Sequence, residues 1–173
     1  MSLRFKQGPE VNGSMGLLIS ILVRYPEVGT VNYDPARRVL KFTFLLQRES
    51  VKDKLPAIAQ GVKTALEVFH ELEGLSPLVT SVEPRLGDGL ASLEVHRDVE
   101  SLSLNEIALL IDLLNQQAGQ VILSEDEGEA LQEEERLWQE ELISHMLDSL
   151  KSGGYDQQVY AFREEGRVMV YNK

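Results

Sequence analysis

Hydrophobic and polar positions repeat one arrangement twice along the chain: two short strand-like runs followed by an amphipathic helix. The first copy spans residues 31–72 and the second spans residues 79–117. Apolar residues alternate with polar ones in the strand-like runs and recur every third or fourth position in the helices. The pattern predicts an α+β fold, in which hairpins form an antiparallel sheet and helices pack on one face. Hairpin-plus-helix is a common supersecondary choice, so a duplicated ββα unit and an unrelated recurrence both remain open.

In the first copy we expect strands at 30–33 and 39–46, joined by a turn that starts at Asp34 and Pro35. These residue types suit the first two positions of a type I turn. The core face of the second strand is expected to carry Leu40, Phe42, Phe44 and Leu46. A helix is expected at 53–73, with Asp53 as its N-cap. Its buried stripe is expected to contain Leu55, Ile58, Val62, Leu66, Phe69 and Leu72.

In the second copy we expect strands at 78–83 and 90–96, with a loop at 84–89 between them. Ser103 then caps a helix, and Glu106 stands three residues later, which is the capping-box spacing. A further short strand is expected at 120–123.

The first apolar element, residues 14–25, fits either a helix or a buried strand. We favour the helix, because Asn12 or Ser14 can cap its start and Pro26 enforces its end. The element is apolar nearly all round, which predicts burial against the sheet or in a subunit interface.

The last part of the chain predicts a long helix at 128–151 and a hairpin at 159–171 that turns at 164–166. The helix is expected to pack through the apolar positions Leu131, Trp138, Leu142, Met146 and Leu150. We divide the chain into an α+β part, residues 1–124, and a second part, residues 125–173, packed on the same domain.

Composition narrows the classes of function. The chain of 173 residues has no cysteine, which excludes disulfides, thiolate metal sites and a cysteine nucleophile. The longest apolar run, residues 15–23, is too short to cross a bilayer. We therefore expect a cytoplasmic protein without a membrane segment.

The net charge of −11 disfavours nucleic-acid binding, because an acidic surface repels phosphates. Residues 125–141 hold nine carboxylates against one arginine. Most of these are expected to be solvated carboxylates that support the helix dipole, and Glu133, Glu134 and Glu135 are candidates for docking a basic partner.

Arg163 and Arg167 flank the last turn and form the second candidate partner-binding surface. Tyr160, Phe162 and Tyr171 stand nearby, and such aromatics suit either stacking on a nucleotide or packing within a sheet, of which packing is the simpler reading.

The three histidines offer one weak metal motif. Glu141 and His145 are four residues apart on one helix face and are the candidate metal ligands. Two ligands do not make a site, and a solvated ion pair is the explanation of the spacing that we favour. We expect His96 to pair with Glu94 at the surface, and His70 to lie at the edge of its helix stripe with its ring reaching water.

Together these features favour a non-catalytic binding or assembly protein without a cofactor. The alternative is a small metal-assisted hydrolase or nucleotide-processing enzyme that uses Glu141 and His145. A homodimer is expected, formed through the first apolar element and Trp138.

Overall fold

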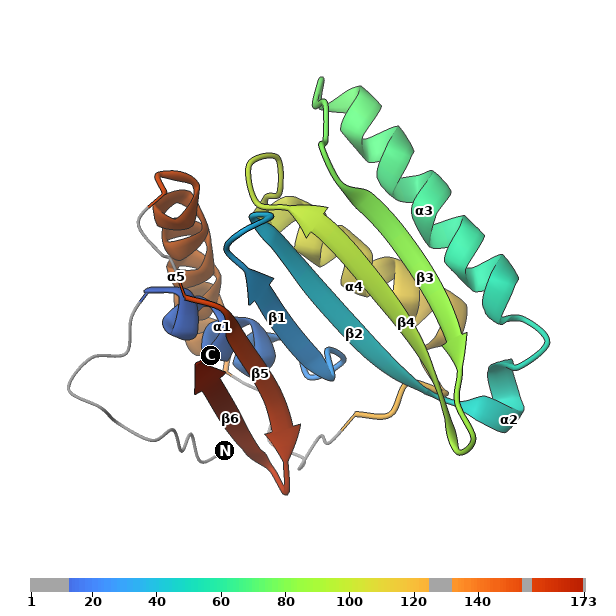
Figure 1. The fold of residues 1–173 in the computed structure, drawn as a ribbon. Coiled ribbons are helices and arrows are strands. Elements are labelled where there is room, and N and C mark those ends of the chain that lie inside the picture. Colours follow the sequence, from blue (N-terminus) through green and yellow to red (C-terminus); the bar gives the residue numbers. More distant parts are fainter. Residues whose placement is uncertain (1–12, 125–131, 154–156, 173) are drawn as a thin grey trace.

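The computed structural model describes residues 13–124, 132–153 and 157–172. In chain order the elements are α1 (Gly13–Arg24), β1 (Thr30–Asp34), β2 (Val39–Gln47), α2 (Arg48–Val51), α3 (Leu55–Leu72), β3 (Thr80–Leu86), β4 (Leu90–Asp98), α4 (Leu104–Ala118), α5 (Glu133–Lys151), β5 (Val159–Glu164) and β6 (Arg167–Asn172). Figure 1 shows their arrangement, with the helices on one face of the sheet.

The strands form one six-stranded sheet in the order β3-β4-β2-β1-β5-β6, and every neighbouring pair is antiparallel. The predicted α+β fold is therefore confirmed. The register aligns the buried positions of neighbouring strands, so Phe42 lies between Val31 and Val95. The other face of the sheet, which we call the outer face, is covered by no described helix (Figure 1).

The core lies between the sheet and the helices. Its strand residues alternate as the sequence predicted, with Leu40, Phe42, Phe44 and Leu46 at most 1% exposed. The first apolar element forms the helix α1, and its residues Leu17, Leu18, Ile21 and Leu22 are fully buried. Helix α1 packs against α5, β5 and β6, so its apolar surface is covered within this chain.

A duplicated ββα unit, one of the two possibilities that the sequence left open, is not confirmed. A hairpin followed by a helix does occur twice in chain order, but the two hairpins occupy different places. Strands β1 and β2 lie at the centre of the sheet, whereas β3 forms an edge. The C-terminal hairpin joins the same sheet, because β5 pairs with β1.

Two expected boundaries are wrong in the 50–90 region. The N-cap of α3 is Lys54, not Asp53, and its side chain makes no cap hydrogen bond. The expected loop at 84–89 is shorter, because β3 continues to Leu86. Pro84 is tolerated there because β3 is an edge strand, where a missing N–H donor costs no ladder bond.

Helix α3 also differs from its predicted buried stripe. His70 is 4% exposed, whereas Leu72 is 82% exposed. The expectation that the His70 ring reaches water is therefore wrong. The reason is a buried carboxylate beside the imidazole, described below, which the spacing of apolar residues cannot reveal. The expected strand at 120–123 is reduced to one bridge between Leu46 and Ile122.

Helix α5 begins later than expected, and only part of its expected stripe lies in the core: Leu150 is buried and Met146 is partly buried, whereas Trp138 is exposed. Gln132 has extended backbone, so the helix starts at Glu133, and expected positions 128–131 lie outside the described residues. Its buried residues are Ile143, Leu147 and Leu150. Trp138, placed in the buried stripe by the sequence, is 60% exposed. Contact with α1 buries the side of the helix that carries Ile143 and Leu147. The spacing of apolar residues along α5 does not by itself show which side is buried.

Within the described residues, no helix combines the length and the apolar character that crossing a bilayer requires.

Candidate functional site

The first turns of α5 carry an exposed group of acidic and apolar side chains, which we call the α5 surface. It consists of Glu133, Glu134, Glu135, Leu137 and Trp138, and all five residues are exposed. Trp138 and Leu137 are 60% and 55% exposed. Single apolar side chains are common at protein surfaces, but two large ones side by side among carboxylates form a candidate contact surface.

The C-terminal half of the same helix is held firmly by the rest of the chain. Ile143, Leu147 and Leu150 are buried, and α5 packs along α1. The Nε of Arg24 donates to the Glu140 carboxylate at 2.8 Å. At the other end, the Arg38 guanidinium donates to the carbonyl of Leu150 at 3.2 Å. The α5 surface is therefore displayed on an anchored helix rather than on a loop.

The carboxylates of the α5 surface outnumber the single cation among them, Arg136. Glu133, Glu134 and Glu135 occupy the first turn, where the positive end of the helix dipole stabilises carboxylates. None of the three forms an ion pair with a described residue. The surface therefore presents negative charge to any cationic group that approaches.

Arg163 and Arg167 lie on opposite faces of the C-terminal hairpin. Arg163 is opposite Val168 in the β5–β6 register and points toward the helices, whereas Arg167 is exposed opposite Glu164. The Arg163 guanidinium donates to the carbonyls of Leu22 at 2.7 Å, Tyr25 at 3.2 Å and Val28. The structure thus uses Arg163 at the C-terminal end of α1 and does not join it with Arg167 in one patch.

The candidate metal ligands Glu141 and His145 are both exposed on α5. The described residues contain one His/Asp/Glu group with metal-like spacing, and it is a different one: Glu83, Glu94 and His96, whose ligand atoms lie within 4.8 Å of one another. Sequence reasoning missed this group because Glu83 and Glu94 face each other only across the β3–β4 register.

An arginine already pairs with both carboxylates of that group. The Nε of Arg85 lies 3.1 Å from the Glu94 carboxylate, and its terminal nitrogen lies 3.3 Å from Glu83. The imidazole Nε2 of His96 is 3.5 Å from Glu94. A divalent cation could use these ligands only after the guanidinium moved away.

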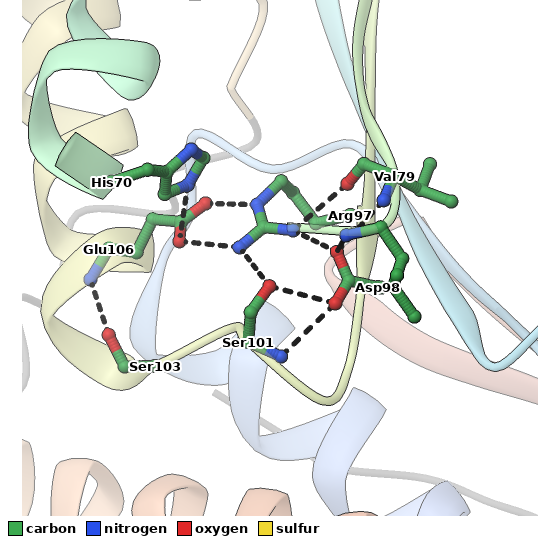
Figure 2. Close-up of polar contacts among 8 residues, drawn as sticks. His70, Val79, Arg97, Asp98, Ser101, Ser103 and Glu106 are labelled. Atoms are coloured by element: carbon green, nitrogen blue, oxygen red, sulfur yellow. Dashed lines mark hydrogen bonds and ion pairs between the residues drawn. The ribbon is translucent and has the colours of Figure 1, made fainter. Parts of the chain in front are cut away.

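A buried charge network joins the end of β4 to the helices (Figure 2). Its centre is Arg97, which is 1% exposed. Its guanidinium donates two hydrogen bonds to the Glu106 carboxylate, two more to the Val79 carbonyl and Asp98, and one to the Ser101 hydroxyl. A buried guanidinium is tolerable only when its donors are paired in this way.

The remaining members complete the network. The carboxylate of Asp98 accepts from the backbone N–H groups of Leu78 and Val79 at 3.1 and 3.0 Å, and from the Ser101 hydroxyl at 2.8 Å. The Nε2 of His70 lies 3.0 Å from Glu106. The network therefore ties α3, α4 and the β3–β4 hairpin together around one arginine.

Hydrogen bonding changes the acidity of Asp98. Burial alone would raise the pKa of its carboxyl. The Val79 N–H, the Ser101 hydroxyl and the Arg97 guanidinium outweigh burial, so the pKa lies below its ordinary value.

The charged groups of the network are buried and face one another. Its titratable side chains are at most 5% exposed, and their polar atoms are directed at one another (Figure 2). Its role is to lock helices to the sheet. One member gave a sequence signal: Ser103 does cap α4, accepting from the Glu106 N–H at 3.2 Å. The Glu106 carboxylate, however, turns to Arg97 rather than completing the capping box.

Comparison with protein-family models, with curated proteins and with solved structures finds no match to this chain.

Proposed function

We propose that this chain is a non-catalytic, cytoplasmic binding or assembly protein, and that the α5 surface is its docking element. The observation that carries the proposal is the exposure of Trp138 beside three carboxylates that have no cationic partner in the described chain. Tryptophan is enriched among the few residues that dominate binding energy at protein interfaces.

The chemistry of the α5 surface defines its partner. Three carboxylates on one helix turn favour a protein surface rich in lysine and arginine, since complementary charge accelerates encounter and orients docking. Leu137 and Trp138 require an apolar recess in that surface, because large apolar groups contribute most when they are desolvated. The same carboxylates repel nucleic-acid phosphates.

The test reverses the charge of the acidic turn. We compare partner recovery on the immobilised full-length protein for the wild type, the triple variant Glu133→Lys/Glu134→Lys/Glu135→Lys, and Trp138→Ala. The matched control is Glu67→Lys/Glu71→Lys/Glu73→Lys, which changes the same charge at exposed positions around the end of α3. Recovery should fall at least tenfold in both α5 variants and stay unchanged in the control. Unchanged recovery with the α5 triple variant would rule out this surface.

Intrinsic fluorescence gives an independent readout. Trp138 is the only tryptophan, so its emission reports on the α5 surface alone. A recovered partner should shift the emission to shorter wavelength as it covers the ring, and the shift should weaken as salt screens the carboxylates. Binding that leaves the emission unchanged would place the partner elsewhere.

The alternative function, a metal-assisted hydrolase, keeps one observation in its favour: the grouping of Glu83, Glu94 and His96. Divalent metal that binds the native state should raise the melting temperature. We compare Mg²⁺, Mn²⁺ and Zn²⁺ with the wild type, His96→Ala and His145→Ala. Stabilisation lost in one histidine variant would locate the metal, and no stabilisation by any of the three ions would remove the alternative.

A further inference from the structure

The two edges of the sheet are built differently. Strand β3 has Pro84 within it and the charged residues Glu83 and Arg85 around that proline, and α3 lies along it (Figure 1). Proline, charge and a covering helix are devices that prevent an edge strand from pairing with another chain.

Strand β6 is less protected. Its only charged residue, Arg167, is its first residue, and α1 packs against β6 on the face of the sheet that carries the helices. Between Arg167 and Asn172 it consists of Val168, Met169, Val170 and Tyr171, all favourable in strands, with no proline and no charge. Figure 1 shows β6 at the end of the sheet, and no described strand or helix lies beyond it. Its outward backbone groups are therefore available for another strand.

The outer face next to this edge is apolar and aromatic. Tyr160 lies opposite Tyr171, and Phe162 lies opposite Met169. The ring of Phe162 is 5.5 Å from Tyr171 and 5.6 Å from Tyr160, measured between centroids. Tyr171 is 55% exposed. These aromatic side chains therefore form a row on the outer face that reaches the unpaired edge of β6, and a further strand paired with β6 would lie beside them.

A second copy of β6 fits this edge in one register. Residues directly opposite in an antiparallel pair point to the same face, so outer residues must meet outer residues. With Met169 opposite its own copy, Arg167 lies opposite Tyr171 and Val168 lies opposite Val170. Every residue from Arg167 to Tyr171 is then paired.

Neighbouring registers fit less well. A register centred on Val170 carries Arg167 beyond the end of the opposite strand, because β6 ends at Asn172. A register centred on Val168 carries Tyr171 opposite the turn residue Glu165, which has a positive φ of 50°. The register centred on Met169 also avoids like charges, since each Arg167 guanidinium meets a tyrosine ring.

We propose that the chain forms a two-fold dimer in which β6 pairs antiparallel with β6 of a second copy, with the two Met169 residues opposite each other. The sheet then continues through both copies, and the helices of both lie on the same side. This interface is independent of the α5 surface. It differs from the dimer expected from the sequence, because α1 is buried within the chain.

An introduced cysteine tests the register directly, because the chain has none of its own. In Met169→Cys the two thiols stand opposite each other, where side chains are close enough for a disulfide. The matched control is Ser92→Cys, a half-buried outer-face position on β4, which β2, β1 and β5 separate from β6. Under mild oxidation we expect most of Met169→Cys to run as a linked dimer in non-reducing electrophoresis, against a small fraction of Ser92→Cys.

Charge at the same position tests the interface without oxidation. Met169→Glu and Met169→Lys each place like charges opposite one another and should be monomeric by light scattering, and mixing them should restore a dimer. Circular dichroism checks that each variant is folded. A monomeric wild type, or a dimer that neither substitution disrupts and Met169→Cys does not link, would overturn the proposal.

Discussion

At the residue scale, stability depends on buried charged groups that are paired with one another. Arg97 pairs with Asp98 and with Glu106, which lies on α4, so two buried carboxylates share one guanidinium. Burying these charges is costly, and removing one partner leaves the other uncompensated. Such groups make stability sensitive to substitutions that would be neutral at the surface.

Asp98→Asn should lower the free energy of unfolding at neutral pH. It should also make that free energy fall less steeply as the pH is lowered. The native carboxyl has a lowered pKa, so it contributes stability above the unfolded pKa, and this contribution is lost as pH falls through the native pKa. The variant should lose about 3 kcal/mol of unfolding free energy at pH 7. This is the lower end of the cost of breaking a buried ion pair, because Arg97 still pairs with Glu106.

Urea denaturation at neutral and at acidic pH measures this effect. Asp53→Asn is the control, because Asp53 is exposed. If acidification lowers the free energy of unfolding equally in Asp98→Asn and in the wild type, Asp98 does not contribute to acid sensitivity.

At the element scale, the C-terminal end of α1 depends on a strand far along the chain. The guanidinium of Arg163, on β5, donates to the Leu22 carbonyl in the last turn of α1 and to the Tyr25 and Val28 carbonyls that follow the helix. Carbonyls at a helix C-terminus have no partner within the helix, and a cation there is favourable. One side chain therefore fixes α1 against the sheet.

Arg163→Ala should destabilise the fold, whereas Arg167→Ala should not. Loss of charged hydrogen bonds to half-buried carbonyls costs about 1.5–3 kcal/mol. Arg167 is exposed, and removing it should change stability by less than about 0.5 kcal/mol. The free energy of unfolding in urea separates the two, and equal losses would contradict the capping role.

At the scale of the whole molecule, the helices cover one face of the sheet and leave the outer face and the β6 edge open (Figure 1). The net charge of −11 then acts differently on the two proposed contacts. Two copies of the chain repel each other, whereas the α5 surface attracts a basic partner.

Salt should therefore shift the two contacts in opposite directions. Raising ionic strength from about 0.05 to 0.5 M shortens the screening length several-fold, which should strengthen the β6 dimer and weaken partner binding at the α5 surface. Analytical ultracentrifugation measures the first, and Trp138 fluorescence measures the second. Salt-induced dissociation of the dimer would indicate an interface held by ion pairs rather than by β6.

Local patterns in the sequence were enough to predict most of the helices and strands, and the core face of β2. Alternation in β2 identified its core side, the positions of Asp34 and Pro35 placed the first turn, and Ser103 marked the start of α4. Each of these signals depends on residues within a few positions of one another, where backbone geometry sets the spacing of side chains.

The strand order, the burial of Arg97 and the hydrogen bonds from Arg163 to the end of α1 became known only from the tertiary structure. It also decided which stripe of α5 packs, and so left Trp138 outside the core. These features depend on pairs separated by long stretches of chain, such as Arg163 and Leu22. Local periodicity shows that a side chain can be buried or paired, but its partner is known only when the fold brings distant segments together.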